Sequence, residues 1–411
     1  GHTGGGVSLA EVVRAETALL MPTYDRYRVL FRRGRGCYLY DARGRRYLDL
    51  LSGIGVNALG YAHPAILRAL HAQADRLVHV SNLFFHDYQA QLARKLKKLS
   101  GFDRAFFTNS GSEAIEGALK LARAYARLHC PNGRRPRYRV LALENSFHGR
   151  TFGALAATGQ KKYRQPFAPL MPGVRFVRFN NRSDLRRKFD GSVCAVLLEP
   201  IQGEGGIQLV SREFFRLARK LTQQSHALLI ADEIQCGLGR TGRWFAFQHS
   251  GIEPDVVTLA KPLAAGLPLG AILARQRVAR AFAPGLHGTT FGGGPLACAV
   301  AIAFLEILEK EDLLERIREV GNYFRAQLEA LQEKHPVIRE VRGLGLMLGV
   351  ELKHPGKALV RQALAHGLVL NCTHDTVLRF LPPYIITREQ LNQAVEILDE
   401  LLTRWKPDSK A

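Results

Sequence analysis

Residues 104–128 read RAFFTNSGSEAIEGALKLARAYARL, a short apolar run followed by a polar turn and an amphipathic segment. The aromatic run is typical of a strand. After the turn, apolar residues recur three or four positions apart, which predicts a helix. The stretch therefore predicts a strand, a tight turn and a helix in succession, the repeating unit of an α/β fold.

The same alternation continues over residues 101–275. Further strands are predicted at 138–143, 174–179, 193–199, 226–232, 256–260 and 270–275, with helices such as 212–224 between them. Strands rich in Val, Ile and Leu that alternate with helices predict a mostly parallel sheet covered on both faces.

Two different patterns flank this region. Residues 30–53 predict a small antiparallel hairpin set, and residues 301–411 predict an α+β unit of strands and long helices. We therefore expect an N-terminal segment, 1–53, that packs with a smaller C-terminal domain, 301–411, beside a large domain, 54–300. Residues 1–6, GHTGGG, are expected to be a flexible leader outside the fold.

Composition narrows the class of protein. No apolar run is long enough to span a bilayer, so we expect no membrane partner. The six cysteines form no CxxC pair and lack metal-spaced histidines, which favours reduced thiols in the cytosol and predicts no metal site.

The net charge of +22 leaves a second class open, a basic protein that binds nucleic acid. That alternative predicts steep salt-dependent binding to DNA or RNA. Yet the basic residues are spread along the whole chain, and their short clusters lack interleaved aromatic residues. We therefore expect a basic solvated surface and no nucleic-acid partner.

Polar residues follow several predicted strands, where ligands bind in an open α/β sheet. Ser110, Gly111 and Ser112 open a helix, and such a helix start favours a phosphate, although a plain helix cap has the same pattern. Asp232 ends the strand at 226–232 and needs a cationic or protonated partner, which a buried salt bridge would also supply.

Three further positions stand near strand ends. Glu199 follows the strand at 193–199, and Gln235 begins a glycine-rich loop suited to line a cofactor. Lys261 lies in VVTLAKPLAAGLPLGA, residues 256–271, directly after an apolar run. Desolvation there lowers the pKa of an amine and makes it nucleophilic, although a structural lysine remains an alternative for this residue alone. Residues 110–112 could bind a phosphate, Asp232 could pair with a pyridinium nitrogen, and the Lys261 amine could react with an aldehyde. These three functions together are typical of a pyridoxal 5'-phosphate site.

Six ordered segments carry a family resemblance: TNSGSEA, FHGRT, LLEPIQGEGG, ADEIQCGLGRTG, TLAKPLAAGLPLGA and HGTTFGGGPLACAVA. From about residue 20 to 400 the chain resembles the class III (fold-type I) aminotransferases, most of all their acetylornithine aminotransferase group. The resemblance implies a homodimer with shared active sites that moves the terminal amino group of N2-acetylornithine to 2-oxoglutarate. Ornithine, succinylornithine, 4-aminobutyrate and a carrier-protein-linked lysine remain alternative amino donors.

By this resemblance, Lys261 binds the cofactor covalently, Asp232 pairs with its pyridine nitrogen, and Gln235 contacts its phenolic oxygen side. Residues 110–112 hold its phosphate. Phe147 is expected to stack on the ring and Thr290 to reach the phosphate of the neighbouring subunit's cofactor. His148 is expected to be a packing residue only.

The resemblance also implies a substrate site. Arg150 is expected to bind a carboxylate, because a guanidinium offers a rigid bidentate fork. Arg379 is a second candidate, covered by Glu199 unless a dicarboxylate is bound, and Tyr24 and Asn82 are expected at the entrance. Two positions depart from the usual pattern, Gly294 in place of an asparagine and Pro262 after the lysine.

Overall fold

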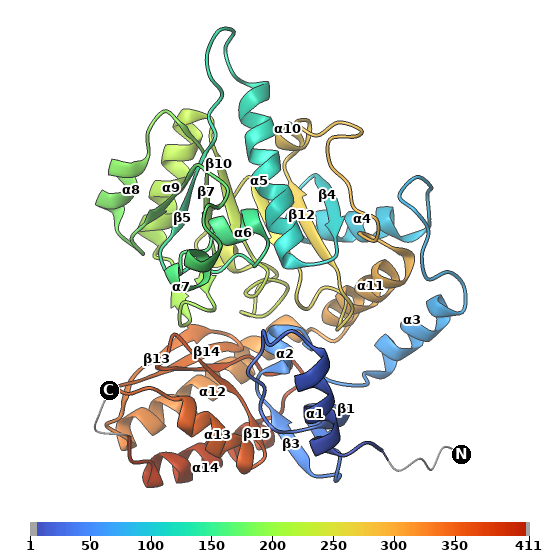
Figure 1. Cartoon of the computed structure of the whole chain (residues 1–411), viewed down its shortest axis with the longest axis vertical. Helices are drawn as coiled ribbons and strands as arrows, with labels where there is room; N and C mark the ends of the chain where they lie inside the picture. The colour runs from blue at the N-terminus through green and yellow to red at the C-terminus, as the bar shows by residue number, and fades with distance from the viewer. Residues whose placement is uncertain (1–5, 408–411) are drawn as a thin grey trace.

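A seven-stranded sheet forms the centre of the larger part of the molecule in this computed structural model, which describes residues 6–407 (Figure 1). Its strands lie in the order β4, β12, β11, β10, β7, β5, β6. In chain order they are β4 (Arg104–Thr108), β5 (Arg139–Leu143), β6 (Val174–Val177), β7 (Val193–Leu198), β10 (Leu228–Asp232), β11 (Val256–Leu259) and β12 (Gly270–Ala274). Strand β12 pairs antiparallel with both neighbours, and the other pairs are parallel. The predicted mostly parallel sheet is confirmed.

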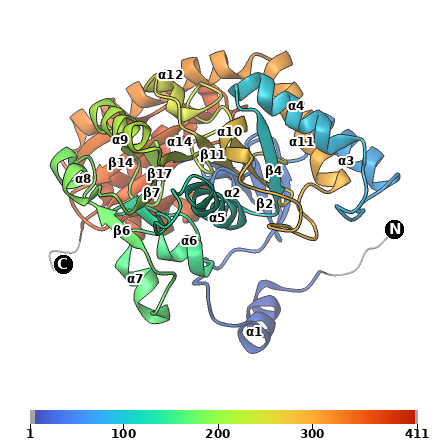
Figure 2. The ribbon, with the colours of Figure 1, turned by 90° about the horizontal axis from the view of Figure 1, so that it is seen from above.

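Helices cover both faces of this sheet, as predicted. Along β5, Val140 and Ala142 pack into the same apolar cluster as helix α5 (Gly111–Leu128), whereas Leu141 and Leu143 join the cluster that contains Phe214 and Phe215 of α9 (Arg212–Ser225). Successive side chains of a strand point to opposite faces, so an all-apolar strand needs both helices. Seen from above, α5 and α9 lie on opposite sides of the strands (Figure 2).

Shorter elements complete the large part. They are α3 (Pro64–Ala74), α4 (Tyr88–Ser100), α6 (Phe152–Ala156), α7 (Lys161–Arg164), η1 (Gln165–Phe167), α8 (Arg182–Lys188), the hairpin β8 (Ile201–Gln202) and β9 (Gln208–Leu209), η2 (Ala246–His249) and α10 (Gln276–Ala279). The hairpin and the loop after β10 lie at the carboxyl edge of the sheet, where they border the site described below.

A smaller antiparallel sheet lies in the C-terminal part, in the order β13, β14, β17, β16. Its strands are β13 (Ile338–Leu344), β14 (Met347–Leu352), β16 (Asn371–Thr373) and β17 (Val377–Phe380), and its helices are α12 (Leu313–Lys334), α13 (Lys357–Ala365) and α14 (Arg388–Arg404). The Phe324 ring on α12 packs edge-on against Phe380, with 5.3 Å between centroids. Helix α11 (Pro295–Lys310) contacts α3, α4 and α12, and the predicted boundary at residue 300 falls inside it, so that division stays a prediction.

The N-terminal strands β1 (Phe31–Arg35), β2 (Tyr38–Asp41) and β3 (Arg46–Asp49) form an antiparallel set that β15 (Leu368–Val369) extends by pairing parallel with β3. Short helix α2 (Ser52–Gly55) follows. Helix α1 (Leu9–Leu19) projects from the body and has no buried residue (Figure 2). The expected leader at residues 1–6 lies outside the described residues except for Gly6. Between residues 6 and 407 no helix is both long and apolar enough to cross a membrane.

Candidate active site

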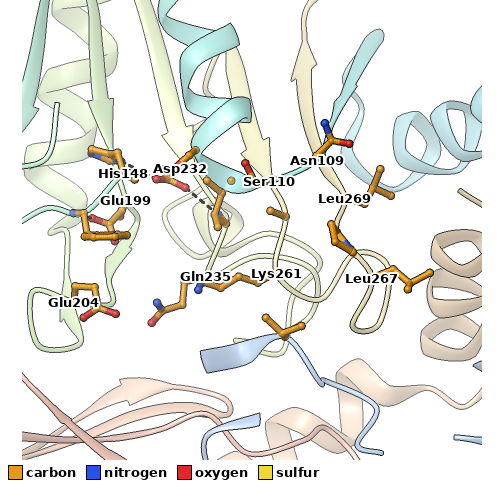
Figure 3. Close-up of a pocket in the computed structure, with 18 of the residues that line it drawn as sticks. Asn109, Ser110, His148, Glu199, Glu204, Asp232, Gln235, Lys261, Leu267 and Leu269 are labelled. Carbon is orange, nitrogen blue, oxygen red and sulfur yellow. Dashed lines mark hydrogen bonds and ion pairs between the residues drawn. The ribbon is translucent and has the colours of Figure 1, made fainter. Parts of the chain in front are cut away.

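A cavity of about 400 Å³ opens at the carboxyl edge of the central sheet (Figure 3). Eight predicted site residues line it: Ser110, Gly111, Ser112, Phe147, Glu199, Asp232, Gln235 and Lys261. They come from segments spread over 150 positions of the sequence, and they meet because parallel strands end at one edge.

The start of α5 forms one wall of the cavity. Ser110 caps the helix, since its Oγ accepts a hydrogen bond from the Glu113 backbone N–H at 3.2 Å. Within residues 6–407, the backbone N–H groups of Gly111 and Ser112 donate to no other group, so both remain available to an anion. A Cβ at position 111 would lie 2.9 Å from the Ile234 side chain, which explains the glycine there.

Asp232, at the end of β10, is held by three donors. His148 Nδ1 lies 2.7 Å from its Oδ2, and its Oδ1 accepts from the Ile234 N–H at 3.0 Å and from Thr258 Oγ1 at 3.2 Å. Burial alone would lower the pKa of His148, but the hydrogen bond and charge of Asp232 raise it overall. The expectation that His148 only packs is wrong, because its ring points at the Asp232 carboxylate (Figure 3).

Lys261 projects into the cavity from the end of β11, whose four residues are all buried. No hydrogen bond or ion pair to another described residue holds its amine. Burial and then the positive charge of Arg379 lower the pKa of Lys261, while nearby carboxylates, Glu204 foremost, oppose this shift. A larger neutral fraction makes the amine a better nucleophile.

Glu199 does not pair with Arg379, so the predicted pair is wrong. Its carboxylate accepts hydrogen bonds from the backbone N–H groups of Phe147 at 2.9 Å and Gly203 at 3.2 Å, and burial raises its pKa to about 7. The partner of Arg379 is Glu204, with 2.7 Å between Nη1 and Oε1.

The hairpin β8–β9 explains why Glu204, and not the predicted Glu199, pairs with Arg379. It turns the chain back after Glu199 and carries Glu204 toward β17, where Arg379 is only 1% exposed. Burial would raise the pKa of Glu204, but the Arg379 guanidinium lowers it overall. Nη1 of Arg379 also donates to Gln235 Oε1 at 3.3 Å, which joins the pair to the cavity wall. Both glutamates stand in LLEPIQGEGG, and spacing alone does not tell which one reaches the arginine.

The other predicted residues lie outside the cavity wall of this chain. The guanidinium of Arg150 is exposed and stacks on Tyr163, 3.9 Å from the ring centroid. Tyr24 is 75% exposed, and Thr290 is exposed as well. Asn82 donates hydrogen bonds to the carbonyls of Thr289 and Gly292, which places it beside the loop that carries Thr290.

Several residues of the wall were not predicted. They are Val56, Asn109, His148, Gly149, Glu204, Ile234, Ala260 and the segment 266–269. The side-chain amide of Asn109 donates to Glu113 Oε1 at 2.9 Å and to Thr289 Oγ1 at 3.0 Å, which ties the helix start to the loop before Thr290. Their place in the sequence could have identified some of them. Asn109 directly precedes Ser110, and residues 266–269 lie in the stretch 256–271 that contains Lys261.

The site thus combines three features: the Lys261 amine at a strand end, the buried Asp232 carboxylate held by its donors, and a helix start whose N–H groups can bind an anion. Together they are typical of an enzyme that works on amines and carbonyl compounds. The family model described as Aminotransferase class-III matches residues 20–402. The chain is 46% identical over 385 residues to the acetylornithine aminotransferase of Methanocaldococcus jannaschii, covering 93% of this chain and 96% of that protein. It is also 46% identical to that of Caldanaerobacter subterraneus subsp. tengcongensis, covering 95% and 99%. The chain belongs to the class III aminotransferases.

Solved structures agree with this assignment. The ornithine aminotransferase of Toxoplasma gondii ME49 matches with a TM-score of 0.91 and 33% identity, covering 97% of this chain and 96% of that one. A second structure of a Toxoplasma gondii ornithine aminotransferase reports pyridoxal phosphate at partial occupancy in its active site. Class III aminotransferases use pyridoxal 5'-phosphate. The cavity fits that cofactor, because it offers a braced carboxylate together with a lysine amine and N–H groups at the start of α5 that have no partner among residues 6–407.

Proposed function

We propose that this chain transfers the terminal amino group of N2-acetylornithine to 2-oxoglutarate, giving N-acetylglutamate 5-semialdehyde and glutamate. The observation that carries the proposal is the 46% identity, over more than nine-tenths of the chain, to two proteins named acetylornithine aminotransferase. The three-part site around Lys261, Asp232 and the start of α5 supplies the groups that such a reaction needs.

Pyridoxal 5'-phosphate, when bound, supplies an aldehyde and an electron-withdrawing ring. Lys261 would hold it through its amine, and the same amine would move a proton as general base and acid. Asp232, braced by His148 and Thr258, would pair with the ring nitrogen. Residues 110–112 would hold the phosphate, Phe147 would stack on the ring, and Gln235 would contact its phenolic oxygen side.

For substrate binding, Arg150 is the carboxylate clamp in this proposal. Arg379 and Glu204 form a switch, in which the pair stays closed beside an amine substrate and opens when the second carboxylate of glutamate or 2-oxoglutarate binds Arg379. Glu199, which the sequence predicts as the acid of this switch, is instead engaged by backbone N–H groups.

The proposal includes a cytosolic homodimer. In such a dimer Thr290 would reach the phosphate of the partner's cofactor, and Tyr24 and Asn82 would lie at the substrate entrance. None of the three lines the cavity of its own chain. Large apolar side chains near Asn82 and Thr290 are exposed in the single chain, among them Phe84 at 65% and Phe291 at 66%. A second subunit would remove this apolar surface from water. All six cysteines are free, which suits the cytosol.

The second candidate function is amino transfer from another ω-amino donor, and ornithine is the donor that a specific observation favours. The structural match to an ornithine aminotransferase reaches a TM-score of 0.91, although the sequence identity is 33%. A common fold does not fix the substrate. The higher identity to acetylornithine aminotransferases therefore decides the order of the two candidates.

A half-reaction panel tests the proposal. Enzyme loaded with cofactor is mixed separately with N2-acetylornithine, ornithine, succinylornithine and 4-aminobutyrate, and loss of the lysine-bound cofactor's absorbance is followed. We expect N2-acetylornithine to react with the highest kcat/KM, by about tenfold or more, a difference of about 1.4 kcal/mol in transition-state binding. A faster reaction with ornithine would establish the second candidate. Lys261→Ala is the control, and it should show neither the absorbance band nor turnover.

A further inference from the structure

A second cavity, of about 750 Å³, lies between the N-terminal segment 25–29, the strand β3 and the helix α13. It shares no residue with the candidate active site. In Figure 1 these elements gather in the lower part of the molecule, where β3, β15 and α13 are neighbours. The cavity is therefore formed by the two ends of the sequence rather than by the central sheet.

The charges that line this cavity are unbalanced. Its walls carry five basic side chains, Arg26, Arg28, Arg45, Lys357 and Arg361, and one acidic side chain, Asp25. Lys357 pairs with Asp25 at 3.2 Å, and Arg26 pairs with Glu16 at 3.1 Å. The remaining three arginines form no ion pair with any residue between 6 and 407.

No carboxylate between residues 6 and 407 accepts a hydrogen bond from the side chains of these three arginines. Arg45 donates a hydrogen bond to the Ala365 carbonyl, which is a neutral acceptor. The carboxylate of Asp41, four residues before Arg45, accepts hydrogen bonds from the backbone N–H groups of Arg43 and Arg45 and from the Tyr47 hydroxyl. An adjoining cavity shares Arg28 and Arg45 and adds Arg32, Arg43 and the acidic Asp41 at its walls, so basic side chains outnumber acidic ones there as well.

We propose that this cavity binds a small molecule bearing a pyrophosphate group, either a nucleoside diphosphate or inorganic pyrophosphate. Guanidinium groups bind phosphate oxygens through paired, charge-assisted hydrogen bonds, and several arginines around one space suit an anion with several charges. The volume is within the range of small-molecule sites. Tyr27, 43% exposed at the wall, offers an aromatic face on which a base can stack.

Calorimetric titration of cofactor-loaded enzyme with inorganic pyrophosphate and, separately, with adenosine diphosphate tests the proposal. Bound cofactor occupies the phosphate-binding helix start of α5. The titration therefore measures binding at the second cavity and not at the active site. We expect one ligand per chain with a Kd below about 1 mM. The double variant Arg28→Gln, Arg361→Gln should weaken binding by about tenfold or more, since it removes two charge-assisted contacts.

Arg182→Gln, Arg186→Gln is the matched control. Both arginines are exposed on α8, form no ion pair with another described residue and lie far from the cavity, so the control removes the same net charge and should leave Kd within about twofold. Tyr27→Ala distinguishes the two ligand sources, because it should weaken only the nucleotide. Absence of saturable binding by both ligands, or equal weakening in the two double variants, would overturn the proposal. All four substituted arginines are exposed, so their replacement removes no core contact.

Discussion

Two glutamates five positions apart have opposite electrostatic environments in this site. Glu199 is held by backbone N–H groups, and its pKa is raised to about 7 by burial. Glu204 is paired with Arg379, which keeps its pKa low and leaves it charged at neutral pH. The charge of Glu204 therefore partly offsets that of Arg379 at the amine of Lys261.

This balance predicts the effect of Glu204→Gln on the pH dependence of cofactor binding. The pKa of Lys261 already lies below 10.5, because burial and Arg379 disfavour its ammonium form. Removing the Glu204 carboxylate leaves Arg379 uncompensated and lowers this pKa further. Capture of the cofactor aldehyde requires the neutral amine, so its rate should reach half-maximum at lower pH in the variant. Stopped-flow absorbance of cofactor-free enzyme mixed with pyridoxal phosphate measures this midpoint.

The exposed Glu213→Gln on α9 is the control for that measurement, since it removes one carboxylate far from the cavity. Its midpoint should equal that of the unaltered enzyme. A midpoint in Glu204→Gln that stays in place or moves to higher pH would contradict the assignment of Glu204 as the carboxylate that supports the ammonium form.

At the scale of elements, the start of α5 combines two opposing effects at Gly111. Alanine is the better helix former, but the cost of glycine at the first helical position is small because that N–H has no partner within the helix. The contact with Ile234 acts against alanine, since a Cβ would lie 2.9 Å from two of its carbon atoms. Ile234 also lines the cavity, so any displacement changes the cavity's shape.

We therefore predict that Gly111→Ala weakens cofactor binding by about fivefold to thirtyfold, corresponding to about 1–2 kcal/mol of overpacking. Fluorescence titration of the cofactor-free enzyme measures the Kd. Replacing Ile234 by alanine in the same chain should restore much of the affinity. Gly191→Ala, where an added Cβ meets nothing within 4 Å, is the matched control and should bind normally. Normal binding by Gly111→Ala would show that the close approach is unimportant.

The elements themselves could be predicted well because their patterns are strong. Each strand of the central sheet begins and ends within two residues of its predicted range, for example β10 at 228–232 against 226–232. The order of the strands could not be predicted, since the parallel neighbours β7 and β10 are both fully buried and, apart from Asp232, both apolar. Site residues just after strands, such as Lys261, could also be predicted, because the strong apolar pattern of each strand shows where it ends. The contacts of His148 and Glu204 depend on loop geometry, and local pattern does not encode it.

The whole molecule carries 58 Lys and Arg against 36 Asp and Glu, a difference of 22 positive charges. Such an excess destabilises the compact state through self-repulsion. Salt screens this repulsion, because the Debye length falls from about 30 Å at 0.01 M to about 3 Å at 1 M ionic strength. Salt also weakens surface ion pairs such as Arg325–Glu329, but exposed pairs contribute only about 0–1 kcal/mol each. We therefore expect net repulsion to be the larger effect.

We predict that the unfolding temperature of the cofactor-loaded enzyme rises with potassium chloride concentration. The rise should be about 1 °C for each kcal/mol of repulsion that salt removes, because the unfolding entropy of a chain of 411 residues is large. Scanning fluorimetry at fixed pH and saturating cofactor measures it, because cofactor occupancy also shifts the unfolding temperature. Sucrose at matched osmolality controls for solvent effects other than screening. The double variant Arg182→Gln, Arg186→Gln carries two fewer positive charges and should respond less steeply to salt. If the unfolding temperature instead falls with salt, favourable ion pairs outweigh the repulsion, and the cationic excess is stabilised by pairing across the surface.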